Sequence, residues 1–254
     1  MQLKANLAML MIAAALGLSA CQQRAPEGEA AGMPEAAPEA GAPMEAAPME
    51  PAMPAAGPAK YRVELTSLWT KANFPFEYPD SSLLHKPHFS GLIGTAHNAS
   101  YRIFAAGQAP TPGLERLSEQ GKHDPLDAEI NAAIAAGNAL ALTQSGPLRD
   151  FTQTLTAEVA VDEAHPMVSL VAMIAPSPDW FTGVADVNLL ENGAWVATKT
   201  VDAQAWDSGG DDGTTYLAAD KDTDPKKPTN MANTQHFMKD GAMAPVARIT
   251  FTRM

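Results

Sequence analysis

Cysteine is almost absent from this sequence, since Cys21 is the only one among 254 residues. A single cysteine excludes a framework of intrachain disulfides and a zinc site built on several thiolates. Long apolar runs are also missing, because no segment reaches the roughly 20 apolar residues that a membrane-spanning helix needs. The sequence therefore predicts a fold stabilised by its hydrophobic core, alone or together with a metal ion.

Positive charge is scarce, with 17 Lys and Arg residues against 29 Asp and Glu residues and a net charge of -12. Such an acidic surface repels nucleic-acid phosphates and anionic lipid headgroups. We therefore expect no nucleic-acid partner and no direct electrostatic binding to anionic lipid. The acidic excess does suit divalent cations.

The first residues have the pattern of an export signal. Lys4 precedes an apolar stretch at residues 7–18, and small residues lead to Cys21. The run Leu18-Ser-Ala-Cys21 resembles the lipobox of bacterial lipoproteins, in which the cysteine becomes the lipid-modified first residue. Gln22 follows it where an inner-membrane sorting signal would have Asp, which implies the outer membrane. The alternative is a secreted protein with an incidental cysteine.

Three regions follow from this pattern and from composition. Residues 1–20 are predicted to be a lipoprotein signal peptide. Residues 21–59 contain the lipidated cysteine and a stretch of mostly Pro, Ala, Glu, Gly and Met. Because dense proline opposes helices and strands, this stretch is predicted to be an extended acidic tether; a Pro-rich ligand for a partner is the alternative. Residues 60–254 are long enough for one domain with a sizeable core.

Alternating apolar and polar residues predict that this domain is mainly β. The predicted strands cover residues 61–66, 100–104, 155–161, 167–174, 184–190, 194–201 and 246–252. Asn192-Gly193 indicates a hairpin between two of these strands, because both residues tolerate positive φ. Seven short strands predict an antiparallel β-sandwich.

One or two short helices interrupt the strands. Asp124 is predicted to cap a helix whose first residue is Pro125 and whose apolar face includes Ile130 and Ile134. A shorter helix is predicted over residues 114–120. We expect both helices to pack against an edge or an end of the sandwich.

Three blocks of sequence resemble the spondin domain family, the F-spondin/mindin-type module. They are residues 87–98 (Pro-His-Phe-Ser-Gly-Leu-Ile-Gly-Thr-Ala-His-Asn), residues 169–183 with Pro-Ser-Pro-Asp-Trp-Phe-Thr-Gly, and residues 206–213 (Trp-Asp-Ser-Gly-Gly-Asp-Asp-Gly), followed by residues 247–253 near the end. The resemblance implies an antiparallel β-sandwich with a calcium ion held by loop aspartates. It also implies a role in adhesion rather than catalysis. At matching positions the implied calcium ligands are Asp179, Asp207 and Asp211.

Calcium chemistry supports the same three aspartates. Calcium takes six to eight oxygen ligands, so it needs carboxylates on loops that can curl around it. Asp207 and Asp211 flank a Gly-Gly pair, and Asp179 follows Pro178 at the end of a strongly apolar predicted strand. An EF-hand is excluded, because the sixth and twelfth positions counted from Asp207 are Asp212 and Ala218. The alternative is that all three are ordinary turn residues.

Several other acidic, histidine and tryptophan residues are candidates for metal or ligand sites. Asp220, Asp222 and Asp224 could hold a second ion, but their neighbouring lysines favour a solvated charge cluster. His85, His88 and His97 could suggest zinc, yet they lack the His-Glu-x-x-His spacing, and buried hydrogen-bonding roles are favoured for the last two. Trp180 is predicted to belong to the core.

No nucleophile elbow, phosphate-binding glycine loop or Ser-x-x-Lys motif occurs, and we predict that the protein is not an enzyme. The predicted function is an envelope-anchored, calcium-binding adhesion or binding module of spondin type. Its partners would be the membrane, through the lipid on Cys21, and a protein or glycan surface ligand. A metal-dependent hydrolase of envelope or extracellular polymers is the alternative, and a purely structural envelope protein is a third possibility.

Overall fold

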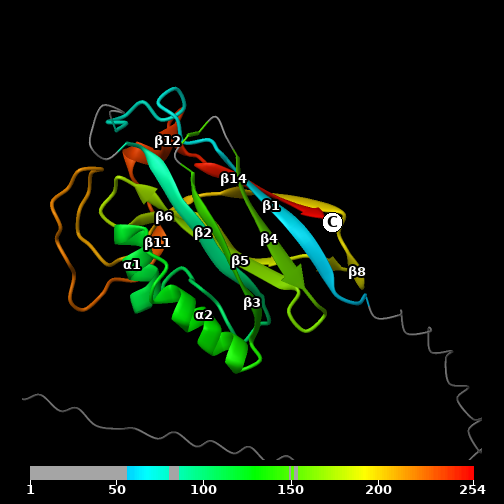
Figure 1. Cartoon of the computed structure of the whole chain (residues 1–254). Helices are drawn as coiled ribbons and strands as arrows, with labels where there is room; N and C mark the ends of the chain where they lie inside the picture. Colours follow the sequence, from blue (N-terminus) through cyan, green and yellow to red (C-terminus); the bar gives the residue numbers. More distant parts are fainter. Residues whose placement is uncertain (1–55, 80–85, 149, 152–153) are drawn as a thin grey trace, which may run out of the picture. The chain divides into compact units, whose positions relative to one another are not determined.

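A computed structural model describes residues 56–79, 86–148, 150–151 and 154–254 (Figure 1). These residues fall within the unit Pro51–Met254. The predicted signal peptide, Cys21, most of the predicted tether and His85 lie outside the described residues. In the described part, no helix is both long and apolar enough to cross a bilayer.

Two antiparallel sheets form the body of the fold (Figure 1). The first sheet has four strands in the order β4 (Thr154–Val161), β1 (Ala59–Ser67), β14 (Ala247–Arg253) and β9 (Thr198–Ala203). The second has six, in the order β11 (Asn230–Met231), β10 (Ala205–Asp207), β6 (Trp180–Asn188), β5 (Met167–Ala175), β2 (His88–His97) and β3 (Ala139–Leu148). The mainly β, antiparallel fold predicted from the sequence is confirmed.

Smaller elements lie between these strands along the chain. Two short hairpins pair β7 (Leu190–Glu191) with β8 (Ala194–Trp195) and β12 (Met238–Lys239) with β13 (Ala242–Met243), and a 3-10 turn, η1, spans Gln235–Phe237. Two helices, α1 (Pro112–Gln120) and α2 (Leu126–Ala135), follow β2 along the chain.

The pattern of buried residues along the strands differs between the two sheets. In β1 and β4, buried and exposed residues alternate, as in a sheet with one face on the core. In β2 and β5, nearly every residue is buried. Leu170, Ala172 and Ile174 belong to the main core cluster, whereas Val171 between them belongs to a second cluster. The six-stranded sheet is therefore covered on both faces.

The two helices provide this second layer (Figure 1). Leu114 and Leu117 of α1, with Leu126 and Ile130 of α2, are fully buried in one cluster with the outward-facing Ile93, Val171 and Phe181 of the sheet. Thr111 caps α1, because its hydroxyl accepts a hydrogen bond from the Leu114 amide at 3.2 Å. The predicted position of the helices at an edge or end is wrong, since they lie on a face of the larger sheet.

Two predicted strands are corrected by the structure. Residues 100–104 form a loop, and the alternation of Tyr101 and Ile103 reflects their packing in the helix-covered cluster rather than strand pairing. The Asn192-Gly193 turn has the predicted positive φ values of 51° and 74°, but its hairpin joins only the short strands β7 and β8. The longer strands on either side, β6 and β9, belong to different sheets.

Helix α2 begins one residue later than its predicted start. Leu126 is its first residue, Pro125 occupies the cap position, and no side chain caps the helix. Strands β2 and β3 were not predicted. Strand β2 is continuously buried but includes small and polar residues such as Ser90, Gly91 and Thr95, so neither alternation nor an apolar run marks it. Strand β3 carries Gly146 and Pro147 near its end.

Candidate metal site

Asp179 lies at the centre of the candidate site, in the turn between β5 and β6. Its side chain is completely buried. Its Oδ2 accepts hydrogen bonds from the Ser208 hydroxyl at 2.9 Å and from the Gly209, Gly210 and Asp211 amides at 2.9, 2.9 and 3.2 Å. The loop after β10 is thus wrapped around one carboxylate oxygen of the turn after β5.

The other oxygen of Asp179 has no such partner. Oδ1 is buried, and no hydrogen bond reaches it within the described part of the chain. Burial raises the pKa of Asp179, although hydrogen bonds from the 208–211 loop oppose that rise. A buried carboxylate oxygen without a donor is costly, and a bound cation would remove that cost.

Asp207 lies close enough to Asp179 to feel its charge. Burial, together with the charge of Asp179, raises the pKa of Asp207 to about 6. The Gly209 amide donates to Asp207 Oδ1 at 3.0 Å and partly offsets this rise. Asp207 also lines a cavity of about 300 Å³ that is shared with Trp180, Gly213 and Thr214. Asp179 does not line this cavity, but a cation bound near the two repelling carboxylates would stabilise them.

Asp211 points its carboxylate into its own loop. Its Oδ1 accepts from the Gly213 amide at 2.5 Å, and its Oδ2 accepts from the Lys221 amide. It lines a different cavity, of about 230 Å³, with Glu119 and Asp220. The structure therefore places the three predicted ligands on the same pair of loops, with Asp179 beside Asp207, but it does not gather all three carboxylates into one tight group.

The Gly-Gly pair between Asp207 and Asp211 is required by the backbone. Gly209 has a φ of 87°, and a Cβ placed there would lie 2.2 Å from the Lys227 carbonyl oxygen. Only glycine fits this position. The turn at Gly209 allows successive amides to point at Asp179.

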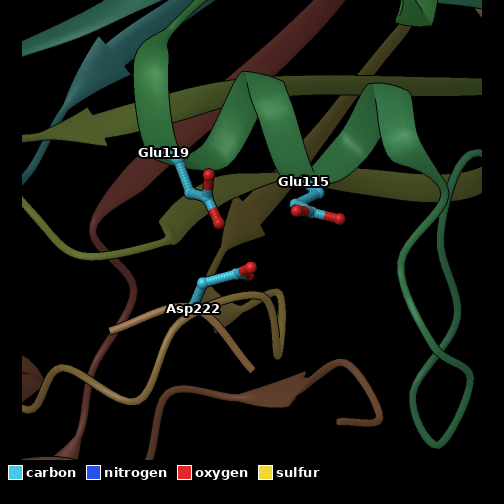
Figure 2. A group of neighbouring side chains, drawn as sticks. All are labelled: Glu115, Glu119 and Asp222. Atoms are coloured by element: carbon cyan, nitrogen blue, oxygen red, sulfur yellow. The ribbon is translucent and has the colours of Figure 1, made fainter. Parts of the chain in front are cut away.

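One group of three acidic side chains has oxygens within 4.8 Å of one another among the described residues: Glu115 and Glu119 of α1 and Asp222 (Figure 2). The ammonium group of Lys226 lies 2.9 Å from Glu115 Oε1 and also contacts Asp222. Burial, with the charges of Glu115 and Asp179, raises the pKa of Glu119 to about 7. Lys226 thus supplies a cation to this trio, as expected for the predicted lysine-rich charge cluster.

Sequence reasoning missed Glu115 and Glu119. The available signal was their spacing, because residues four apart lie on one face of a helix. Nothing in that spacing shows that the face points at a loop about 100 residues later in the chain.

The histidines do not form a metal site in the described structure. His97 is fully buried, with Nδ1 2.9 Å from the Asn98 carbonyl oxygen and Nε2 2.7 Å from Ser169 Oγ. The predicted buried hydrogen-bonding role is confirmed for His97. His88 is only partly buried, and its Nδ1 lies 2.7 Å from the Lys86 carbonyl oxygen.

Asp186 lies 3.7 Å from His97 Nε2, which completes a Ser, His and Asp group with Ser169. Ser169 and His97 are both fully buried, so a substrate does not reach them. This group does not favour the hydrolase alternative. Trp180 is 2% exposed and packs against Tyr216 and Phe237, which confirms its predicted core role.

Comparison with known proteins identifies relatives of this chain. The Spondin_N family model matches residues 59–243. Spondin-2 from Homo sapiens is 32% identical over 207 residues, which cover 77% of this chain and 62% of that protein. Spondin-1 from Xenopus laevis is 28% identical over 211 residues, which cover 79% of this chain and 26% of that protein. The chain thus spans less than two thirds of the length of these relatives.

Proposed function

The chain belongs to the Spondin_N family, and on this premise we propose that it is a calcium-binding adhesion or binding module anchored in the cell envelope. Its family membership supports a binding role outside the cytoplasm. Its partner would be a protein or glycan on a neighbouring surface. Asp179, Asp207 and Asp211 would hold the calcium ion.

The observation that carries the calcium proposal is the bare, buried Oδ1 of Asp179, whose other oxygen shares the Gly209 amide with Asp207 Oδ1. Calcium prefers carboxylate, carbonyl and water oxygens in irregular arrangements, which two irregular loops can supply. Asp211 can also bind the ion although both its oxygens accept hydrogen bonds, because each carboxylate oxygen has a second lone pair. A bound ion would relieve the repulsion between Asp179 and Asp207.

Isothermal titration calorimetry of the full chain tests this proposal. We expect saturable calcium binding in the parent protein and weaker binding after Asp207→Asn, which keeps the shape but removes one charge. Asp202→Asn is the matched control, because Asp202 is exposed and pairs with Arg248 on another strand. Magnesium should substitute poorly, since it demands a smaller octahedral shell. No calcium heat, or unchanged affinity in Asp207→Asn, would show that these aspartates are only turn residues.

Anchoring rests on the lipobox-like run that ends at Cys21. We propose that Cys21 carries the lipid and that the outer membrane holds the protein. In cells fed a labelled palmitate analogue, the parent chain should be labelled and Cys21→Ser should not be, because serine offers no thiol to carry the lipid. Equal label on both proteins would rule out this anchor.

A further inference from the structure

One half of strand β6 has no neighbouring strand on its outer side. β10 pairs with β6 only from Trp180 to Thr182, whereas the pairing of β5 with β6 extends to Asn188. The strand before β10, β9, pairs with β14 in the other sheet. Within the described residues, β6 therefore presents an open sheet edge from residue 183 onward, continuous with the β10 ladder.

A groove of about 390 Å³ runs beside this open edge. Ala185 and Asp186 of β6 line one side, and Phe104, Trp206 and Gln204 line other parts of it. The Phe104 and Trp206 rings meet edge to face, with centroids 5.1 Å apart. The groove thus places an unpaired strand edge, lined by Gly183, Val184 and Ala185, beside an aromatic wall. An added strand uses such an edge for backbone pairing and neighbouring pockets for its side chains.

The side chain of Gln204 has an unmet hydrogen-bonding requirement. Its Oε1 is buried without a hydrogen-bond partner, and only Asp179 and Asp186 have oxygens in the same condition among the described residues. Native proteins leave few buried polar atoms unpaired. A carboxamide both donates and accepts, so a peptide group of a ligand would match it.

Asp186 limits the length of the open edge. Its φ is 56°, a strained value for a residue other than glycine, and its amide donates to Ser169 Oγ at 3.0 Å. Its carboxylate pairs with Arg102 at 2.8 Å. The pairing between β5 and β6 is irregular at this point. A bulge and a charged pair interrupt an edge, so regular pairing is available only over residues 183–185, about 10 Å of strand.

We propose that this groove binds a short extended segment of a partner protein as an added strand on β6. The backbone of the segment pairs with residues 183–185, one of its peptide groups meets the Gln204 carboxamide, and an apolar side chain packs on Phe104 and Trp206. The short pairable length favours a peptide over sheet-to-sheet association. This surface is distinct from the aspartate loops, and the proposal does not depend on calcium.

The test uses the full chain carrying Cys21→Ser, and a phage-displayed library of linear peptides as the probe. The strongest selected peptide is synthesised and titrated by calorimetry. Gln204→Met and Ala185→Arg should each weaken its binding by about tenfold or more, because one removes the carboxamide and the other fills the groove. Ala141→Arg is the matched control and should bind as the parent does, since Ala141 is exposed on β3, the opposite edge of the same sheet.

Melting temperatures separate binding from folding. Gln204→Met should melt at or above the temperature of the parent, because it removes a buried oxygen that has no partner. Selected peptides that bind Gln204→Met and Ala185→Arg as tightly as the parent, or a library that yields no binder, would overturn the proposal. Light scattering that shows a dimer lost in Ala185→Arg would assign the edge to a second copy of the chain and overturn the peptide assignment.

Discussion

Replacing Asp179 with alanine is expected to lower the free energy of unfolding by on the order of 3 kcal/mol or more, even in the presence of a chelator. The change removes the one acceptor shared by the Ser208 hydroxyl and the Gly209, Gly210 and Asp211 amides. The Gly209 and Gly210 amides keep second acceptors, Asp207 Oδ1 and Ser208 Oγ, so the Ser208 hydroxyl and the Asp211 amide are the donors left without a partner. Each buried donor in that condition costs about 1–3 kcal/mol, less where the loop relaxes toward water. Urea denaturation followed by circular dichroism measures the loss.

Asp179→Asn is the informative comparison. Asparagine keeps an oxygen that can accept from the 208–211 loop, and it removes the buried charge that burial disfavours. With chelator, we therefore expect Asp179→Asn to be at least as stable as the parent. With calcium, only the parent should gain stability, by about 2.7 kcal/mol at a hundredfold excess of the ion over its Kd. Equal losses in the alanine and asparagine variants would contradict the acceptor role of Oδ2.

In the calcium-free protein, the contribution of Asp207 to stability is expected to fall as pH rises from about 4 to about 6. Burial and the charge of Asp179 raise the pKa of Asp207 from 3.8 to about 6. Below pH 3.8 this carboxyl is protonated in the folded and unfolded states alike. Between the two pKa values the folded state retains a proton that the unfolded state has released, so stability falls with rising pH. Above about pH 6 the full loss is present. The shift corresponds to about 3 kcal/mol, which solvent screening of this partly exposed carboxyl reduces to on the order of 2 kcal/mol.

The stability contributed by other carboxylates rises with pH. The pH dependence of stability in the parent is therefore compared with that in Asp207→Asn. A hydrogen bond from Arg248 lowers the pKa of Asp202, which makes its contribution more stabilising as pH rises. Subtracting the Asp207→Asn curve from the parent curve isolates Asp207. The raised pKa of Glu119, about 7, extends the decline above pH 6 in both proteins. Parent and variant curves that run parallel from pH 4 to 7 would contradict the effect, and calcium added at pH 7 should restore the parent.

Much of the fold could be predicted from local patterns. β1, β4, β5 and β14 were predicted within one or two residues, because alternation or continuous apolar character is a property of the strand itself. Residues 100–104 show the limit of this reasoning. Their alternation comes from Tyr101 and Ile103, which pack in the helix-covered cluster, and periodicity does not distinguish burial in a loop from burial in a strand.

The candidate site was likewise only partly predictable from the sequence. The aspartates and the glycine pair are visible in the sequence, and the resemblance of their blocks to the spondin domain is confirmed by the family match. That Asp179 Oδ2 accepts from a loop 29 to 32 residues later, and that its Oδ1 is left bare, could not be predicted. Those hydrogen bonds depend on how two strands of one sheet are brought side by side.

By itself, then, the sequence determined the antiparallel β class, the family and the aspartate-bearing loops, because each depends on residue types at short spacing. Only the tertiary structure decided that the helices cover a sheet face, that Glu115 and Glu119 meet Asp222, and that β6 and β9 separate into different sheets and leave an edge open. The physical reason is that these features arise from contacts between segments far apart in the chain. Their energies depend on the packing of the whole domain, which no local pattern records.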